Sequence, residues 1–280
     1  MELGHEPGLR LSLPTDVAVG ADGTIYVVDS GNHQVAVFDA SGRRVTSLGS
    51  PGSGDRQLMN PVGLAIDSGG DIYVADKDNK RLQVFAGDGG YRRSIDLEEG
   101  DERVTPIDVA LSADGNELFV SANNSHRIVA YSRNGTLLRA WGGEGAEPGQ
   151  LNFPATMALD ESGRLYVVDV LNQRVQVFDS SGTVVTQFGK LGAKPGTLFR
   201  PKGVTLDPAG RSYVSDSYLG VIQVFDASGE FLHVLGESGT PTIFQTPVGL
   251  SFHDSRLYVV QMLPGNVLVL ELGPELEQEQ

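Results

Sequence analysis

The sequence predicts an all-β fold, a six-bladed β-propeller built from four-stranded antiparallel blades. Three observations predict it. A proline recurs every 45 to 48 residues, the same order of alternating apolar stretches and turns follows each proline, and no window keeps the 3.6-residue periodicity of a helix. A unit of this length with four strands is typical of one propeller blade, and six units account for the chain. The prolines that open the units are Pro14, Pro61, Pro106, Pro154, Pro201 and Pro247.

The strands of each unit can be assigned in order. The proline opens a first alternating stretch, which ends at a turn such as Ala21–Gly23, where glycine supplies the positive φ of a tight turn. An aromatic residue followed by valine marks the second strand, and a polar loop separates it from a third strand. A turn such as Asp39–Gly42 then leads to the fourth strand. The aromatic residues are Tyr26, Tyr73, Phe119, Tyr166, Tyr213 and Tyr258, and the third strands end at Phe38, Phe85, Tyr131, Phe178, Phe225 and Leu270.

A small residue stands in the middle of every first strand, four residues after the proline. Large apolar residues flank it, as Val17 and Val19 do in the first unit. This pattern suits innermost strands that crowd together around an axis. The small residues are Ala18, Ala65, Ala110, Ala158, Thr205 and Ser251.

The N-terminal residues are predicted to close the ring. Residues 1–4 (Met-Glu-Leu-Gly) align with the end of a fourth strand, such as 46–49, whereas the last unit ends after its third strand at 267–272. We therefore expect the N-terminus to complete the final blade and so remove an exposed edge. The alternative is that residues 275–280 fold back as that strand. Residues 1–280 are then a single propeller domain.

Composition narrows the function classes. The chain has 280 residues, 36 Gly, 14 Pro and no Cys, and its formal net charge is −15. The absence of cysteine excludes disulfide scaffolds, Cys-ligated zinc and thiol nucleophiles. No apolar run is long enough to span a bilayer as a helix. The negative charge argues against a surface that tracks nucleic acid phosphates.

The second unit resembles the NHL-repeat family almost throughout, and the fourth nearly as well. The matching residues of the second unit are Pro61, Gly63, Ala65, Asp67, Gly70, Tyr73, Val74, Asp76, Asn79, Arg81, Gln83, Val84 and Phe85. The resemblance implies a six-bladed propeller. It leaves the function open, because NHL-like propellers include RNA-binding regulators, partner-binding modules on bacterial surfaces and related lyases.

Three units depart from the family pattern. The third unit has Ala122 where the pattern has aspartate. The fifth has Leu219 and Val221 in the asparagine and arginine positions, and the sixth has Gln261 and Pro264 in the aspartate and asparagine positions. We expect the last two blades to present a different loop on their shared face.

The candidate ligand-binding residues lie near the mouth of the central channel: Asp16, Asp108, Thr156 and Lys202. The family pattern prefers glycine two residues after the proline, where Asp16, Asp108 and Thr156 stand. Two convergent carboxylates could bind a divalent cation, a ligand amine or a basic side chain of a partner. The alternative is that these residues are solvated polar caps on strand ends.

Other polar motifs receive structural interpretations. The run Asp76–Asn79 resembles the start of a calcium loop but lacks the later Gly and Glu, so a turn-bracing role is favoured. No three of the histidines share a rim as a zinc site requires. The basic sector of Lys190, Lys194, Arg200 and Lys202 is too small to predict RNA binding. The histidines are His5, His33, His126, His233 and His253.

The sequence therefore favours a non-catalytic binding or scaffold propeller that presents the loops of one face to a protein partner. The alternative is a metal-assisted lyase or hydrolase with its site at the channel mouth. We expect a monomer that binds no nucleic acid and no cofactor other than a divalent cation at that mouth. We expect a bacterial protein, and we favour the periplasm or cell exterior over the cytoplasm. The absence of cysteine does not fix the compartment, and the presence of an export signal upstream of Met1 is left open.

Overall fold

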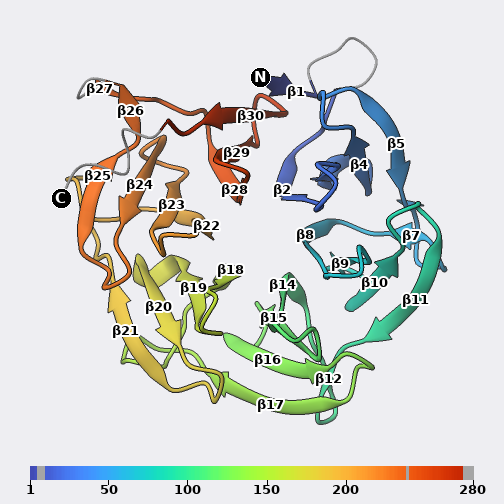
Figure 1. Cartoon of the computed structure of the whole chain (residues 1–280). Helices are drawn as coiled ribbons and strands as arrows, with labels where there is room; N and C mark the ends of the chain where they lie inside the picture. The colour runs from blue at the N-terminus through green and yellow to red at the C-terminus, as the bar shows by residue number, and fades with distance from the viewer. Residues whose placement is uncertain (5–9, 238–239, 274–280) are drawn as a thin grey trace.

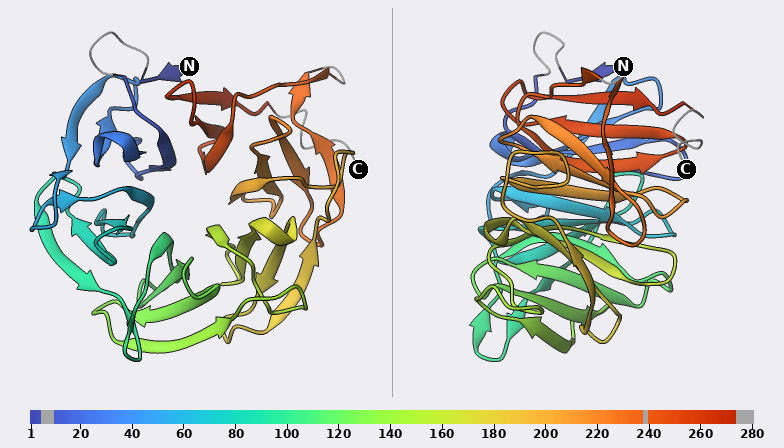
Figure 2. Two further views of the ribbon diagram at one scale, coloured as in Figure 1. Left: turned by 180° about the vertical axis from the view of Figure 1, so that it is seen from behind. Right: turned by 90° about the vertical axis from the view of Figure 1, so that its left-hand side faces the viewer.

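Six four-stranded antiparallel sheets surround a common axis as the blades of a ring (Figure 1). The computed structural model describes residues 1–4, 10–237 and 240–273. The six-bladed propeller that the repeats predict is confirmed. The side view in Figure 2 shows the strands running between the two ends of the ring.

Blades 1 to 5 each use four strands in chain order from the axis outward, and blade 6 takes its outermost strand from the N-terminus. Blade 1 is β2 (Pro14–Val19), β3 (Ile25–Asp29), β4 (Gln34–Phe38) and β5 (Arg44–Leu48). Blade 2 is β8 (Pro61–Ile66), β9 (Ile72–Asp76), β10 (Arg81–Phe85) and β11 (Tyr91–Asp96). Blade 3 is β14 (Pro106–Leu111), β15 (Glu117–Ala122), β16 (Arg127–Ser132) and β17 (Leu137–Gly142).

The second half of the ring repeats this order. Blade 4 is β18 (Pro154–Leu159), β19 (Leu165–Asp169), β20 (Arg174–Phe178) and β21 (Val184–Phe188). Blade 5 is β22 (Pro201–Leu206), β23 (Ser212–Asp216), β24 (Val221–Phe225) and β25 (Phe231–Val234). Blade 6 is β28 (Pro247–His253), β29 (Arg256–Gln261) and β30 (Asn266–Glu271), completed by β1 (Glu2–Leu3).

Short elements occupy the connections. Within the described ranges the helical segments are two three-residue 3₁₀ turns, η1 (Ser30–Asn32) and η2 (Val170–Asn172). Three inter-blade linkers form two-stranded pairs: β6 (Ser50–Pro51) with β7 (Gln57–Leu58), β12 (Glu98–Glu99) with β13 (Glu102–Arg103), and β26 (Gly236–Glu237) with β27 (Thr240–Pro241).

The strand register defines two different ends of the ring. Pro14 at the start of β2 pairs with Asp29 at the end of β3, and the other five blades pair in the same way. The inter-blade linkers and the loops between the second and third strands therefore lie at one end. We call this end the loop face. The first-to-second and third-to-fourth turns lie at the opposite end.

The hydrophobic core is divided among the seams between neighbouring blades. One cluster joins Tyr26 and Val28 of blade 1 to Leu64 and Val74 of blade 2, and the other seams repeat this arrangement. Inner strands of adjacent blades contact one another all round the ring. The small residues predicted for these strands fit that crowding, since Ala18 packs against the first of these clusters.

The N-terminal strand closes the ring, as the sequence predicts. Glu2 pairs with Leu268 and Leu3 with Val267, so β1 is the outermost strand of blade 6. The amino group of Met1 donates a hydrogen bond to the Val269 carbonyl oxygen at 3.0 Å. The alternative closing segment, residues 275–280, lies outside the described residues.

Closure can be tested by truncating a buried side chain of β1. Leu3 is almost completely buried in the core between blades 6 and 1. We expect Leu3→Ala to lower the free energy of unfolding by about 2 to 5 kcal/mol, because it removes buried apolar surface and leaves a cavity. Urea denaturation measures this loss. Leu138→Ala, at an exposed position of the outer strand β17, is the matched control, and equal losses for both variants would contradict closure by β1.

Candidate functional site

A buried aspartate at the end of the second strand braces the loop face in blades 2 and 4. In blade 4, Asp169 Oδ1 accepts a hydrogen bond from the Asn152 backbone N–H at 2.7 Å. Asp169 Oδ2 accepts from Asn172 Nδ2 and from Arg174 Nε, both at 2.8 Å. The carboxylate thus ties the inter-blade linker to the loop between β19 and β20, and its charge is paired with an arginine.

The same network surrounds Asp76, the first residue of the run that resembles a calcium loop. Its Oδ1 accepts from the Met59 backbone N–H at 2.7 Å, and its Oδ2 accepts from Asn79 Nδ2 and Arg81 Nε at 2.8 Å. Both oxygens therefore bond to protein donors, which is the turn-bracing role that the sequence favoured.

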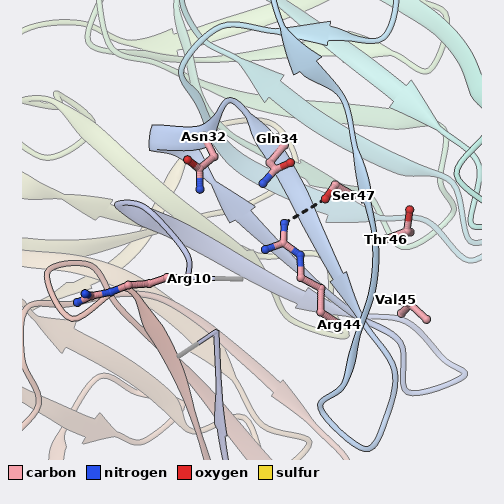
Figure 3. Close-up of a pocket in the computed structure, with 7 residues that line it drawn as sticks. All are labelled: Arg10, Asn32, Gln34, Arg44, Val45, Thr46 and Ser47. Carbon is pink, nitrogen blue, oxygen red and sulfur yellow. Dashed lines mark hydrogen bonds between the residues drawn. The ribbon is translucent and has the colours of Figure 1, made fainter. Parts of the chain in front are cut away.

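In blade 1 different residues surround the equivalent carboxylate, that of Asp29. Gln34 stands in the arginine position and donates from Nε2 to Asp29 Oδ2 at 2.8 Å. Arg44, from the outer strand β5, supplies the positive charge: its Nη2 lies 4.0 Å from Asp29 Oδ2 and donates to Ser47 Oγ at 3.0 Å. These groups line a hollow of about 380 Å³ (Figure 3). Its lining consists of Arg10, Asn32, Gln34, Arg44, Val45, Thr46 and Ser47.

The predicted axial carboxylates bond to neighbouring blades. Each first strand has a register shift after its proline, and such bulges leave backbone groups without a ladder partner. Asp16 Oδ2 accepts from the Leu64 N–H of blade 2 at 3.0 Å. Asp108 Oδ2 accepts from the Met157 N–H of blade 4 at 2.7 Å. Both side chains are buried, so they are not the solvated caps of the alternative interpretation.

Glycine in the preceding blade makes room for these carboxylates. A Cβ atom on Gly249 of blade 6 would stand 2.5 Å from Asp16 Oδ1. A Cβ atom on Gly63 of blade 2 would clash with Asp108 Oδ1 in the same manner. The glycines that follow the family pattern and the aspartates that depart from it therefore form complementary pairs across two seams.

Thr156 continues this pattern at the next seam. Its Oγ1 accepts from the Val204 N–H at 3.1 Å and donates to the Lys202 carbonyl oxygen at 2.8 Å. At the seam between blades 5 and 6, Ser215 Oγ donates to the Val248 carbonyl oxygen at 2.7 Å. Polar side chains near the axis thus join blade to blade.

Burial changes the acidity of the axial pair. It raises the pKa of Asp16 to about 7, against the lowering effect of its backbone hydrogen bonds. Burial, and then the negative charge of Asp16, raise the pKa of Asp108 well above its ordinary value. The negative charge of Asp16 in blade 1 thus disfavours ionisation of Asp108 in blade 3.

Lys202 differs from the other three candidates. It is half-buried on the inner strand β22, and burial, followed by the nearby Arg200 charge, lowers the pKa of its ammonium group. Asp16 and Asp108 thus interact through electrostatic repulsion, and the Thr156 hydroxyl bonds to the Lys202 carbonyl oxygen. Binding of a ligand by these four residues stays a prediction.

Two histidines of the loop face have structural partners. His33 Nδ1 accepts from the Asn60 N–H at 2.9 Å, and His126 Nδ1 accepts from the Phe153 N–H at 3.1 Å. His5 lies outside the described residues. Across residues 1–4, 10–237 and 240–273, no group of three or more His, Cys, Asp or Glu side chains is placed to hold a metal ion.

The loop face also carries an exposed apolar arc that was not predicted from the sequence. The residue two positions after the last residue of the second strand is polar or glycine in blades 1 to 3 and apolar in blades 4 to 6. The three apolar residues of the arc, Leu171, Tyr218 and Leu263, are 51%, 65% and 69% exposed. Comparing this loop position across the six repeats would have shown the asymmetry. The corresponding residues of blades 1 to 3 are Gly31, Asp78 and Asn124.

The chain contains NHL repeats. The family model described as NHL repeat matches residues 11–38, 58–85 and 151–178, which lie in blades 1, 2 and 4. The three unmatched blades are those whose loop residues depart from the family pattern. No curated protein matches the chain.

Solved structures share the fold at low sequence identity. A streptogramin B lyase structure has a TM-score of 0.69 at 16% identity, over 98% of this chain and 87% of that chain. A catalytically inactive virginiamycin B lyase from Staphylococcus aureus with quinupristin gives 0.71 at 14% identity, over 98% and 99%. A gluconolactonase from Xanthomonas campestris gives 0.71 at 17% identity, over 92% and 86%. These similarities establish the propeller fold alone. The described part of the chain contains no helix long and apolar enough to cross a membrane.

The raised pKa of Asp16 predicts that the free energy of unfolding depends on pH. Folded Asp16 keeps its proton up to a pKa of about 7, whereas an unfolded aspartate ionises near about 3.9. Between these values the folded protein binds more protons than the unfolded chain. The free energy of unfolding therefore falls as the pH rises through this interval.

Asp16→Asn removes the pH-dependent loss of unfolding free energy, because asparagine does not ionise. Its side-chain oxygen can still accept a hydrogen bond from the Leu64 N–H. We expect the variant to gain a few kcal/mol over the parent protein between about pH 4 and pH 8, at about 1.4 kcal/mol per pKa unit. Urea denaturation across this range measures the difference. Asp101→Asn, at an exposed loop position, is the control. A difference between Asp16→Asn and parent that stays constant with pH would contradict the raised pKa.

Proposed function

We propose that the protein is a non-catalytic binding or scaffold module whose loop face docks a protein partner. The observation that carries this proposal is the exposed apolar arc. Leu171, Tyr218 and Leu263 occupy equivalent loops of three consecutive blades, and each exposes half or more of its surface. Exposed apolar residues that gather on one face of a protein are typical of interaction sites.

The loops that carry the arc are held in place before any partner arrives. Asp169 joins the Leu171 loop to the preceding linker, and the Leu171 N–H donates to the Asn152 carbonyl oxygen at 3.1 Å. Backbone loops fixed in this way lose little conformational entropy on binding, so more of the contact energy contributes to affinity. A rigid ring with variable loops is a common means of presenting a binding surface.

The alternative function is a metal-assisted lyase or hydrolase that uses Asp16 and Asp108. Its support is that these two carboxyl groups interact electrostatically and that similar folds occur in a streptogramin B lyase and a gluconolactonase. Against it, one oxygen of each carboxyl group accepts a hydrogen bond from the next blade, which reduces the lone pairs left for a metal. Elemental analysis and anomalous diffraction after soaking with divalent cations test it, because the enzyme hypothesis requires bound metal at Asp16 and Asp108.

Site-specific photo-crosslinking tests the docking proposal. With p-benzoylphenylalanine in place of Tyr218, we expect a discrete protein crosslink in cells of the organism that encodes the chain. The same reagent at Glu161, exposed in a turn at the opposite end of the ring, is the control and should give no such product. Crosslinks of equal yield from both positions would contradict the proposal. So would the absence of a Tyr218 crosslink together with turnover of a small substrate by the parent protein and not by Asp16→Asn.

A further inference from the structure

Blade 5 carries an aromatic platform within the apolar arc. The rings of Phe199 and Tyr218 are stacked, with their centroids 4.3 Å apart and an angle of 27° between their planes. Phe199 comes from the linker between β21 and β22, and Tyr218 from the loop between β23 and β24. Both rings are exposed to solvent, Phe199 at 39% of its surface. Two stacked aromatic rings on the surface form a flat apolar contact area of low side-chain entropy.

The fully buried carboxylate of Asp216 holds both halves of this platform. It accepts hydrogen bonds from the backbone N–H of Phe199 at 2.6 Å and from that of Tyr218 at 3.1 Å. It also accepts from the N–H groups of Arg200 and Leu219. In blades 2 and 4 the equivalent carboxylate bonds to an asparagine and an arginine side chain, which blade 5 replaces with Leu219 and Val221. The departure from the family pattern therefore leaves Asp216 to fix the backbone beneath the two rings.

Two cations follow Phe199 closely in the chain. Arg200 directly follows Phe199, and Lys202 is half-buried two residues further along the same segment. The Arg200 charge contributes to the lowered pKa of Lys202, so the two groups repel each other. Among the ion pairs of the described residues, neither cation takes part. Within the described part of a chain of net charge −15, these two neighbouring positive charges thus form no ion pair with a carboxylate.

We propose that this platform, formed by Phe199, Tyr218, Arg200 and Lys202, binds an acidic protein segment that carries an aromatic or aliphatic side chain beside an Asp or Glu. The apolar side chain packs on the stacked rings, and the carboxylate bonds to the Arg200 guanidinium, whose fork matches carboxylate geometry. The bound carboxylate also relieves the repulsion between Arg200 and Lys202. This inference rests on the proposed function and specifies the chemistry of its partner.

A single-stranded nucleic acid is the competing occupant, since bases stack on aromatic rings and phosphates bind cations. The charges disfavour it. Binding of a single-stranded nucleic acid requires a basic groove that follows several phosphates. This surface instead offers two cations on a strongly acidic chain. The Arg200 and Lys202 pair can neutralise one carboxylate. A single carboxylate also meets less long-range repulsion from the acidic chain than a polyanion would.

Selection from a phage-displayed library of random dodecapeptides on the full chain tests the inference. We expect enrichment of peptides that place Asp or Glu next to Phe, Trp, Tyr or Leu. The selected peptide, made synthetically with a fluorescent label, should bind Tyr218→Ala and Arg200→Glu at least about tenfold more weakly than the parent protein. Its affinity should also fall between about 50 mM and 200 mM salt, because part of the attraction is electrostatic.

Two variants serve as matched controls. Leu232→Ala removes an exposed apolar side chain from the outer strand β25 of the same blade, and Arg43→Glu reverses an exposed charge in a third-to-fourth-strand turn. Both should bind the peptide as the parent protein does, and thermal melting of all four variants verifies that each is folded. Enrichment of neutral or basic peptides, no enrichment, or tighter binding of labelled oligouridylate that depends on Tyr218 would overturn the inference. A Tyr218 crosslink to a protein in the experiment above would still support docking in any of these cases, so the two failures are distinguishable.

Discussion

The architecture depends on how the innermost strands satisfy their backbone groups. Each of these strands is the edge of its sheet on the side of the axis, and a bulge after the proline leaves an N–H group without a strand partner. In blades 2, 4 and 5 a side chain of the preceding blade accepts this hydrogen bond, as Asp16 does for Leu64, Asp108 for Met157 and Thr156 for Val204. The ring is therefore closed by polar contacts at its centre as well as by the apolar seams and by β1 at its edge.

The need to satisfy buried backbone groups gives most of the aspartates at the axis and on the loop face a structural role. The axial carboxyl groups have raised pKa values because they are buried between blades, and the aspartates of the loop face are occupied by backbone and arginine donors. The loop face also exposes an apolar arc in blades 4 to 6, formed by Leu171, Tyr218 and Leu263.

Much of the fold could be predicted from the sequence because each blade repeats the same local pattern. The proline positions locate the first strands, and the likeness of residues 1–4 to a fourth strand predicts closure by β1. Burial of Asp16 could not be predicted, because it depends on a glycine more than 200 residues away in the chain, Gly249, which leaves space for the carboxylate. The stacking of Phe199 on Tyr218 likewise joins a linker and a loop whose contact follows from the tertiary fold.

Amide hydrogen exchange measured by NMR tests most directly the claim that the axial acids join the blades. In the parent protein the Leu64 and Met157 amides should exchange only through global unfolding. Asp16→Ala should accelerate exchange at Leu64 by more than about tenfold relative to Met157, because a buried N–H loses its acceptor. A Leu64 amide that exchanges in the parent protein as fast as an exposed loop amide, or that is unaffected by Asp16→Ala, would contradict the account.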